Sequence, residues 1–541
     1  MRAAFIGLGY VGLTTAICMA SRGIEVSGYD VDGGRMESLR RGELPILEPG
    51  LDSLFEGARS RGTISFPGSA EEAVRGADAV FITVGTPSRG DGSIDLSHVV
   101  SAARSIGRAM RSDPKYRVIV VKSTVVPGTT MGPVRSALEG ESGMSCCRDF
   151  GLAMNPEFLR EGSAVEDTLS PDRIVIGESD PRAGDLLLDL YGELHGSAMP
   201  PVLRTTPENA ELIKYANNAF LAIKVSFANM FARLCSRIPG ADVDVVMRGI
   251  GMDRRIGPSF LNAGMAWGGS CFPKDLRAIA AFARGMGVRL DLVEAALEMN
   301  SRGPSEVAEV LEGELGGLRG RVIAVLGASF KPGTDDARES PAIWLAGELG
   351  RRGAIVRVCD PAARAQGIEV IRDPGRCLEG ADAAVLATEW DQFRGLGPED
   401  FLRMRGRVVV DTRRVYDPGR FRAAGVRLIQ LGRGAPREQP IVRRSPGLRG
   451  HGTGPMGMVI AHGNIVDYPF HDGLRNSADN VLSPRGLGAA SLCAHPRGGR
   501  RALRHALRSL IVEVSRAGMP LPLPARYLTA DLVAKKPVLR S

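Results

Sequence analysis

Short apolar runs that end at a glycine, a proline or a polar residue recur through the first part of the chain. They lie at residues 2–6, 24–29, 79–84, 118–121 and 151–154. Short apolar runs between turn residues are typical of strands that are buried on both faces of a parallel sheet. A helical pattern at residues 13–21 joins the first two runs. This order of strand and helix predicts a doubly wound α/β sheet.

A long helical pattern separates this series from a second one. From residue 208 to about 236, apolar side chains recur at helical spacing, and such a long helix commonly joins two domains and pairs with a copy of itself. Strand-like runs return at residues 319–326, 355–360, 383–387 and 408–411, with a helix from Ala342. We expect an α/β fold of two Rossmann-like, doubly wound domains joined by a long central helix, plus a C-terminal tail. The expected boundaries are 1–200, 201–300, 301–434 and 435–541.

The composition of the 541 residues is typical of a soluble globular protein, with 44% hydrophobic and 24% charged residues. The eight cysteines form no CxxC pair and no metal-ligand spacing with the histidines. We therefore expect a reducing, cytoplasmic setting and no metal site. The apolar stretch 3–20 is interpreted as a strand and a helix rather than a signal peptide, because glycines interrupt it. No other run is long enough to span a membrane.

The net charge of +8 is unevenly placed along the chain. Residues 435–541 hold 16 Lys and Arg against 6 Asp and Glu, whereas the preceding residues carry a balance of −2. We therefore expect no nucleic-acid binding by the body of the chain. The tail is rich in Gly, Pro and Arg, with one apolar stripe at residues 500–516. Disorder, an interaction helix and an accident of the reading frame remain open for the tail, and we expect poor order.

The motif GLGYVG at residues 7–12 stands between the first strand and the first helix. This spacing provides a tight turn, a close backbone approach to a pyrophosphate and a helix N-terminus aimed at it. Asp30 ends the second strand, where its carboxylate is placed to accept hydrogen bonds from ribose hydroxyls and to repel a 2′-phosphate. The pattern predicts an NAD site. The alternative is that the glycines serve only helix–strand packing.

Polar residues follow three further strands, at the edge where a parallel sheet binds ligands. Thr86 follows the third strand, Thr124 the fourth, and the turn Asn155-Pro156-Glu157 the fifth. We expect the two threonines to contact the dinucleotide or a sugar, and Glu157 and Glu161 to lie in the same crevice. The alternative for the two glutamates is an exposed i,i+4 pair on a helix.

The segment GGSCFPKD at residues 268–275 holds the strongest candidate for chemistry. Glycines beside Cys271 let a ligand approach the backbone closely. A helix that begins near Pro273 would hold Lys274 and Asp275 close to the sulfur. A cation and a helix N-terminus favour the thiolate, which is the nucleophile. The alternative is a buried structural cysteine.

Lys214 and Asn218 occupy positions i and i+4 of the long central helix. An ammonium and an amide on one helical face can converge on a single oxygen, which is the geometry that stabilises an alkoxide or a tetrahedral oxyanion. The alternative is a surface lysine beside a solubilising asparagine. In the second Rossmann-like domain the glycine signature is lost, so we expect no second NAD site there. Lys331 and Arg338 are the cations that we expect to face phosphate.

Six motifs together resemble the UDP-glucose/GDP-mannose dehydrogenase family of NAD-dependent, four-electron nucleotide-sugar 6-dehydrogenases. They are GLGYVG (7–12), KST (122–124), NPEFLREG (155–162), KYANN (214–218), GGSCFPKD (268–275) and FKP (330–332). They cover the chain to about residue 434 in the family's order, and the tail lies outside the resemblance. The resemblance implies an N-terminal NAD-binding domain, a central dimerisation and catalytic domain, and a C-terminal domain that helps to bind the nucleotide sugar.

The implied chemistry oxidises a sugar C6 alcohol through an aldehyde and a thioester on Cys271, which is hydrolysed to the uronate. Lys214 and Asn218 would stabilise the oxygen whose charge grows, and Asp275 would position water or Lys214. Glu157 is our first choice for activating the hydrolytic water, and its neighbour Glu161 is able to share that role.

The resemblance carries three sets of site residues. The implied catalytic residues are Cys271, Lys214, Asn218, Asp275, Glu157, Glu161 and Thr124. The implied NAD contacts are Gly7, Gly9, Tyr10, Val11, Gly12, Asp30, Arg35, Thr86, Thr124 and Arg338. The implied substrate contacts are Phe158, Leu159, Arg160, Glu161, Lys214, Asn218, Arg255, Phe260, Leu261, Asn262, Gly264, Gly268, Lys331 and Arg413, with Arg255 reaching a neighbouring subunit's site.

The resemblance also bears on the substrate and the assembly. Phe272 resembles the UDP-glucose enzymes, since the GDP-mannose enzymes more often carry Leu at that position, and the N-acetyl-sugar branch often carries His in place of Ser270. We expect UDP-glucose, with GDP-mannose and UDP-N-acetyl-hexosamines as alternatives. We also expect a homodimer or a higher homo-oligomer.

Three other classes of protein remain open at this point. A two-electron hydroxyacid dehydrogenase of the 6-phosphogluconate type has a similar fold and needs no cysteine. A basic nucleic-acid-binding protein is indicated only by the isoelectric point. A non-catalytic nucleotide-sugar sensor would keep the fold, but a binding protein needs no nucleophile such as Cys271.

Overall fold

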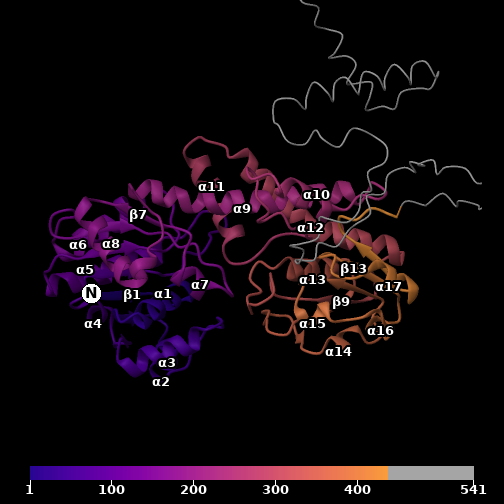
Figure 1. The fold of residues 1–541 in the computed structure, drawn as a ribbon, viewed down its shortest axis with the longest axis horizontal. Coiled ribbons are helices and arrows are strands. Elements are labelled where there is room, and N and C mark those ends of the chain that lie inside the picture. The colour runs from indigo at the N-terminus through magenta and orange to yellow at the C-terminus, as the bar shows by residue number, and fades with distance from the viewer. Residues whose placement is uncertain (437–541) are drawn as a thin grey trace, which may run out of the picture. The chain divides into compact units, whose positions relative to one another are not determined.

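The computed structural model describes residues 1–436, which contain two parallel-sheet domains and the helices that join them (Figure 1). The tail from residue 437 lies outside the described residues, and so does the apolar stripe expected at residues 500–516. Every helix in residues 1–436 is either too short or too polar to cross a lipid bilayer.

The first sheet has eight strands in the order β3-β2-β1-β4-β5-β6-β7-β8. The strands are β1 (Arg2–Ile6), β2 (Glu25–Tyr29), β3 (Ile64–Ser65), β4 (Ala79–Ile82), β5 (Val118–Val121), β6 (Gly151–Met154), β7 (Ile174–Glu178) and β8 (Val202–Thr205). Each of the five runs predicted from the sequence contains a strand. β7 pairs antiparallel with β6, and β8 pairs parallel with β7. These last two strands extend the sheet beyond those that the sequence predicts.

Two apolar layers cover the first sheet. Ala3 and Phe5 of β1 face one layer, and Ala4 and Ile6 face the other. Because both faces are buried, the strands appear in the sequence as unbroken apolar runs. The covering helices are α1 (Tyr10–Ser21), α2 (Gly33–Arg41), α3 (Leu51–Arg61), α4 (Ala70–Val74), α5 (Ser97–Ser112), α6 (Arg135–Ser142), α7 (Ala164–Leu169) and α8 (Pro181–His195), with short turns η1 (Thr130–Val134) and η2 (Gly196–Ala198).

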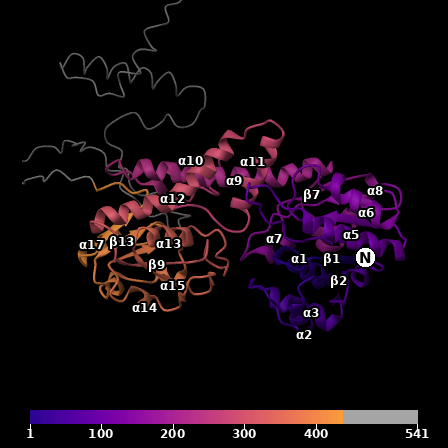
Figure 2. The same cartoon turned by 180° about the vertical axis from the view of Figure 1, so that it is seen from behind.

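The central helix α9 (Pro207–Cys235) has 29 residues and confirms the long helix predicted from the periodicity. It begins where the Thr206 side chain accepts a hydrogen bond from the Asn209 amide, with Pro207 in the first turn. α9 packs against α10 (Val243–Gly251), α11 (Phe272–Gly285) and α12 (Asp291–Leu315). Both views show α9 leading from the first sheet to α10 and α12 (Figures 1 and 2).

The second sheet has six parallel strands in the order β11-β10-β9-β12-β13-β14. They are β9 (Val322–Leu326), β10 (Ile355–Cys359), β11 (Val370–Ile371), β12 (Ala383–Leu386), β13 (Val408–Asp411) and β14 (Arg427–Gln430). The helices are α13 (Pro341–Arg351), α14 (Pro374–Leu378), α15 (Asp391–Arg394), α16 (Pro398–Phe401) and α17 (Pro418–Ala423). The predicted α/β class, with two Rossmann-like domains and a joining helix, is confirmed.

Candidate active site

Cys271 is the N-cap residue of α11, and it keeps some exposed surface although neighbouring protein groups desolvate its sulfur. A Cβ on Gly268 would lie 2.3 Å from the Glu339 carbonyl oxygen, and a Cβ on Gly269, at φ +87°, would lie 2.9 Å from the Phe330 ring. The expectation that a ligand approaches the backbone at these glycines stays a prediction. The glycines make room for the second domain, which packs directly against the cysteine turn.

Lys214 and Asn218 project from one face of α9, and both are buried. Nζ of Lys214 donates to the carboxylate and to the backbone carbonyl of Glu157, each at 2.8 Å. Nδ2 of Asn218 donates to one oxygen of Asp275 at 2.7 Å, and Lys274 donates to the other at 2.6 Å. Two buried carboxylates thus orient the two helical side chains, and Asp275 positions Asn218 rather than Lys214.

The charges around the Cys271 sulfur act in opposite directions. Desolvation of the sulfur raises the pKa of the Cys271 thiol to about 11, and the negative charges of Glu157 and Asp275 act in the same direction. The positive charge of Lys214 opposes them. Lys274, the cation expected to act on the sulfur, bonds to Asp275 instead. The prediction that the groups around Cys271 favour its thiolate is therefore wrong. Desolvation disfavours both charges of the Lys214–Glu157 pair, but their contact keeps the pKa of Lys214 above and that of Glu157 below its usual value.

Glu161 connects the cysteine turn to the second domain. Oγ of Ser270 donates to Oε1 of Glu161 at 3.3 Å and lies 3.7 Å from Sγ of Cys271. Thr334 of the second domain donates to the other carboxylate oxygen at 3.0 Å. Burial and the nearby Asp336 carboxylate raise the pKa of Glu161 to about 7. A carboxyl group that titrates near neutral pH is suited to proton transfer.

A second buried lysine lies next to this cluster. Lys122 follows β5 and donates to Oδ1 of Asn155 at 2.9 Å, and the Tyr191 hydroxyl donates to the same oxygen. Desolvation lowers the pKa of Lys122 to about 8, although the charge of Glu157 opposes it. The sequence analysis places Lys122 in a motif but assigns it no role. Asn155 follows β6 and Tyr191 lies in α8, both far from Lys122 in the sequence. No local pattern therefore predicts that Lys122 is buried.

Glu48 is another buried residue that the sequence analysis missed. Its carboxylate accepts from the backbone amides of Gly162 and Ala164, at 2.8 and 2.7 Å, and from the Tyr10 hydroxyl. The structure thus places the hydroxyl of Tyr10, a predicted NAD contact, against the loop that carries Glu161. Glu48 and the loop that carries Glu161 are more than 100 residues apart in the sequence, so no local pattern connects them.

Glu211 fixes α9 to the loop after β5. Its carboxylate accepts from the backbone amides of Gly128 and Thr130, at 2.6 and 2.8 Å. Glu211 is one turn before Lys214, so this anchor sets the position of the lysine against Glu157. No charge pattern in the sequence distinguishes Glu211 from an exposed helical glutamate.

The three motif glycines near the N-terminus fit a dinucleotide. Gly7 has φ +101°, and a Cβ there would lie 2.8 Å from the Thr83 backbone. A Cβ on Gly12 would lie 2.1 Å from the Gly7 carbonyl oxygen, so α1 packs closely on the turn. A Cβ on Gly9 would meet nothing within 4 Å. A pyrophosphate can therefore approach the backbone at the start of α1, as a bound NAD requires.

Asp30 supports the same turn. One carboxylate oxygen accepts from the Leu8 amide at 2.7 Å and from the Arg35 guanidinium at 3.1 Å. The other accepts from the Asp32 amide at 2.9 Å. The two predicted NAD contacts Asp30 and Arg35 thus lie together at the end of β2.

Several predicted substrate and cofactor residues gather around Glu161 and the domain boundary. Lys331 donates to the Glu161 carbonyl, and Arg338 lies 3.7 Å from the Glu161 carboxylate. Arg413 lies against Gly264, where a Cβ would come within 2.7 Å of its guanidinium. Thr86 accepts from Lys274 at 3.4 Å, and Leu159 donates its amide to Glu157 at 2.7 Å.

Other predicted residues make their contacts away from Glu161. The side chain of Arg255 is 89% exposed and pairs with Asp253 at 2.7 Å. Arg160 pairs with Asp167. The Phe158 ring contacts Arg173 at 3.9 Å and also lies 5.6 Å from the Lys214 ammonium, so Phe158 lies beside the buried pair of Lys214 and Glu157. The remaining predicted positions are Val11 within α1, Thr124 after β5, Phe260 at φ +63°, buried Leu261 and exposed Asn262.

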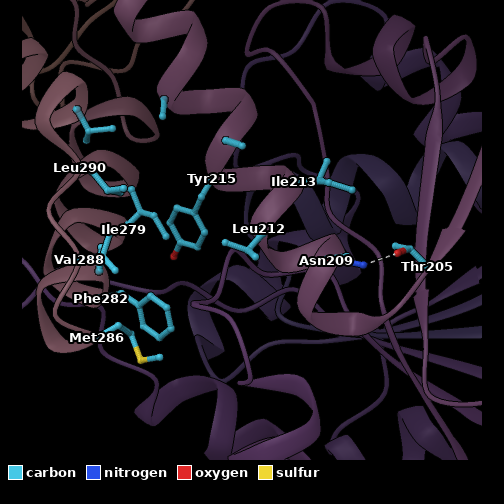
Figure 3. Close-up of a pocket in the computed structure, with 14 residues that line it drawn as sticks. Thr205, Asn209, Leu212, Ile213, Tyr215, Ile279, Phe282, Met286, Val288 and Leu290 are labelled. Carbon is cyan, nitrogen blue, oxygen red and sulfur yellow. Dashed lines mark hydrogen bonds between the residues drawn. The ribbon is translucent and has the colours of Figure 1, made fainter.

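A pocket of about 690 Å³ lies on the other face of α9, between this helix, α11 and α12 (Figure 3). By helical spacing, Leu212 and Ala216 point away from Lys214. The fourteen described residues that line the pocket carry no charged side chain. The pocket therefore lacks the cations that a nucleotide sugar's diphosphate requires.

Three models of one family match the chain. They are described as the UDP-glucose/GDP-mannose dehydrogenase family's NAD binding domain (residues 1–195), central domain (208–302) and UDP binding domain (324–418). The chain belongs to this family. The resemblance drawn from the motifs is thereby confirmed, and so is NAD as the cofactor of this dehydrogenase.

Individual dehydrogenases of the family cover most of the chain. The UDP-glucose 6-dehydrogenase of Haloferax volcanii is 44% identical over 425 residues, which is 77% of this chain and 97% of the relative. That of Rhizobium meliloti is 42% identical over 447 residues, 80% of this chain and 100% of the relative. The solved UDP-glucose dehydrogenase from Pyrobaculum islandicum has a TM-score of 0.74 at 44% identity and covers 80% of this chain and 98% of its own.

Proposed function

We propose that this dehydrogenase oxidises UDP-glucose to UDP-glucuronate, with GDP-mannose or a UDP-N-acetyl-hexosamine as the alternative substrate. The observation that carries the proposal is the cluster of Cys271 with Lys214, Glu157 and Asp275. A two-electron alcohol dehydrogenase needs no nucleophile, whereas oxidation to an acid requires the aldehyde to be held for a second step. The UDP-glucose 6-dehydrogenases among the relatives, together with Phe272 and Ser270, favour UDP-glucose.

The chain's own groups act in a definite order in this proposal. Bound NAD supplies the acceptor for the hydride that leaves C6 in each of the two oxidations. Lys214 and Asn218 stabilise the C6 oxygen as its negative charge grows. The Cys271 sulfur adds to the aldehyde carbon while its proton passes to the aldehyde oxygen, and the second oxidation of this thiohemiacetal leaves a thioester. Glu157 accepts a proton from the water that releases the uronate, and Glu161 is the alternative acceptor.

The remaining predictions extend the proposal to the rest of the molecule. The exposed apolar side chains of α9, among them Phe220 at 64% exposure, support a homodimer or higher homo-oligomer through this helix. The exposed Arg255 would then reach the partner's site. The division into domains at 1–200, 201–300, 301–434 and 435–541, and the NAD and substrate contacts named above, belong to the same proposal. So does a cytoplasmic location, which suits the seven free cysteines of the described residues.

The test is the stoichiometry of NADH formation. Two NADH per UDP-glucose consumed are expected, measured beside GDP-mannose and UDP-N-acetylmannosamine. The variant Cys271→Ala should form no uronate while still binding NAD. One NADH per sugar, or uronate formation by Cys271→Ala, would overturn the reaction. A clear preference for another sugar would overturn only the choice of substrate.

A further inference from the structure

Two adjacent cysteines outside the catalytic cluster bring their sulfur atoms into contact. Cys146 and Cys147 lie in the turn between α6 and β6, with their Sγ atoms 3.6 Å apart. Cys147 is exposed, whereas Cys146 is buried. The Cys147 sulfur is therefore accessible to a small reagent in solution, and the buried Cys146 sulfur is in contact with it.

The turn holds both side chains in this arrangement. The Cys146 amide donates to the Glu139 carboxylate at 3.0 Å, and the Cys147 amide donates to the Phe150 carbonyl at 2.8 Å. The thiol of Cys147 lies 3.7 Å from the Ser179 carbonyl. Cys147 also has φ +67°, a left-handed conformation that is uncommon outside glycine. The contact between the sulfurs is thus part of a hydrogen-bonded turn.

We propose that Cys146 and Cys147 form a redox-active vicinal dithiol, which low-molecular-weight disulfides oxidise reversibly. The Cys147 thiolate attacks one sulfur of the external disulfide, forms a mixed disulfide and releases one thiol. The Cys146 sulfur gives its proton to solvent and attacks Sγ of Cys147, which forms the intramolecular bond and releases the second thiol. Two protein thiols are oxidised, and one external disulfide is reduced to two thiols.

The two cysteines have different roles because their surroundings differ. Exposure makes Cys147 the attacking group. Burial, with the neighbouring Cys147 sulfur adding to it, raises the pKa of Cys146 to about 12. Cys146 therefore loses its proton only as it attacks, and the exchange accelerates as the pH rises.

The geometry also makes the oxidation reversible. Adjacent Cα atoms across a trans peptide are about 3.8 Å apart, which is less than the ~4.4–6.8 Å of ordinary disulfides. A disulfide between neighbours is therefore strained, and strained disulfides are readily reduced and serve as labile rather than structural bonds. The pair precedes the N-terminal end of β6, while Glu157 follows the C-terminal end, so this chemistry is separate from that of Cys271.

The test uses the full-length protein and one peptide. The protein is incubated with an excess of glutathione disulfide over glutathione, alkylated and digested with trypsin. Cleavage after Arg135 and Arg148 releases residues 136–148, in which Cys146 and Cys147 are the only cysteines. The expected product is this peptide, unalkylated and lighter by two hydrogen atoms, and dithiothreitol should restore two alkylated thiols.

Matched variants separate the two steps. Cys146→Ser should accumulate a glutathione adduct on Cys147, because the second thiol is missing, and Cys147→Ser should accumulate neither product. Two alkylated thiols in the oxidised wild-type protein, or a stable glutathione adduct there, would overturn the proposal. NADH formation by both variants should match the wild type and confirms that they are folded. It also keeps this result distinct from a failure of the proposed dehydrogenase reaction.

Discussion

At the residue scale, the candidate site depends on charges buried next to one another. The side chains of Lys214 and Glu157 are only 4% and 8% exposed. Breaking such a buried pair typically costs about 3–5 kcal/mol, against about 0–1 kcal/mol for an exposed pair. The pair therefore holds both groups in one position until a substrate oxygen competes for the ammonium.

Glu161 makes the stability of the folded protein depend on pH. Burial and Asp336 raise its pKa from 4.5 to about 7, so the folded protein binds this proton more tightly than the unfolded chain. The resulting stabilisation is fully present below pH 4.5 and is lost as the pH rises through about 7. The Tm of the wild type should therefore fall relative to that of Glu161→Gln as the pH is raised from about 5 to about 8. Thermal unfolding of both proteins checks this, and a Tm difference that does not change with pH would contradict it.

At the element scale, local patterns were sufficient to predict nine of the fourteen described strands and the long helix. The runs 118–121 and 151–154 coincide with β5 and β6 because burial on both faces leaves no polar position inside a strand. The direction of β7 and the role of Gly268 were not predictable in this way. Gly268 contacts Glu339, which follows it by 71 residues, so its requirement for glycine depends on a partner that no local pattern identifies.

The cysteine turn makes this dependence testable. In Gly268→Ala the new Cβ would lie 2.3 Å from a backbone oxygen, which cannot move aside as a flexible side chain would. The turn must shift, and a displacement of about 1 Å at the reacting sulfur typically lowers kcat/KM about 100-fold. The control is Gly313→Ala in α12, where a Cβ meets nothing within 4 Å. This control should keep its activity and gain up to about 1 kcal/mol of stability. Similar kcat/KM values for the two variants would contradict the packing argument.

At the scale of the whole molecule, residues from both Rossmann-like domains enclose the cysteine turn. Arg277 of α11 pairs with Glu339 at 2.9 Å, and Thr334 bonds to Glu161 of the first domain. The motifs were sufficient to name most of this cluster, because each lies beside a strand end or on one helical face. The pairings within it were not predictable. Asn218 bonds to Asp275, and Lys214 to Glu157, because the fold brings together three segments that are far apart in the sequence.

The last described residues show where the chain can be shortened. The Gly434 amide donates to the Ala241 carbonyl at 2.9 Å, and the Ala435 carbonyl accepts from the Gly240 amide at 2.8 Å. Truncation after Pro436 keeps both contacts, and the last of the three family models ends at residue 418. The truncated protein should therefore form NADH at the rate of the full chain, within about twofold.

The same truncation should reverse the protein's behaviour toward polyanions. The full chain carries a net charge of +8, and residues 1–436 carry −2. At low salt the full chain should bind a heparin column and elute with salt, because counterion release drives such binding. The truncated protein should pass through the column. Retention of the truncated protein on the column would instead place a polyanion-binding surface on residues 1–436. In the activity assay of the same truncated protein, a loss of NADH formation would show that the catalytic cluster depends on residues beyond Pro436.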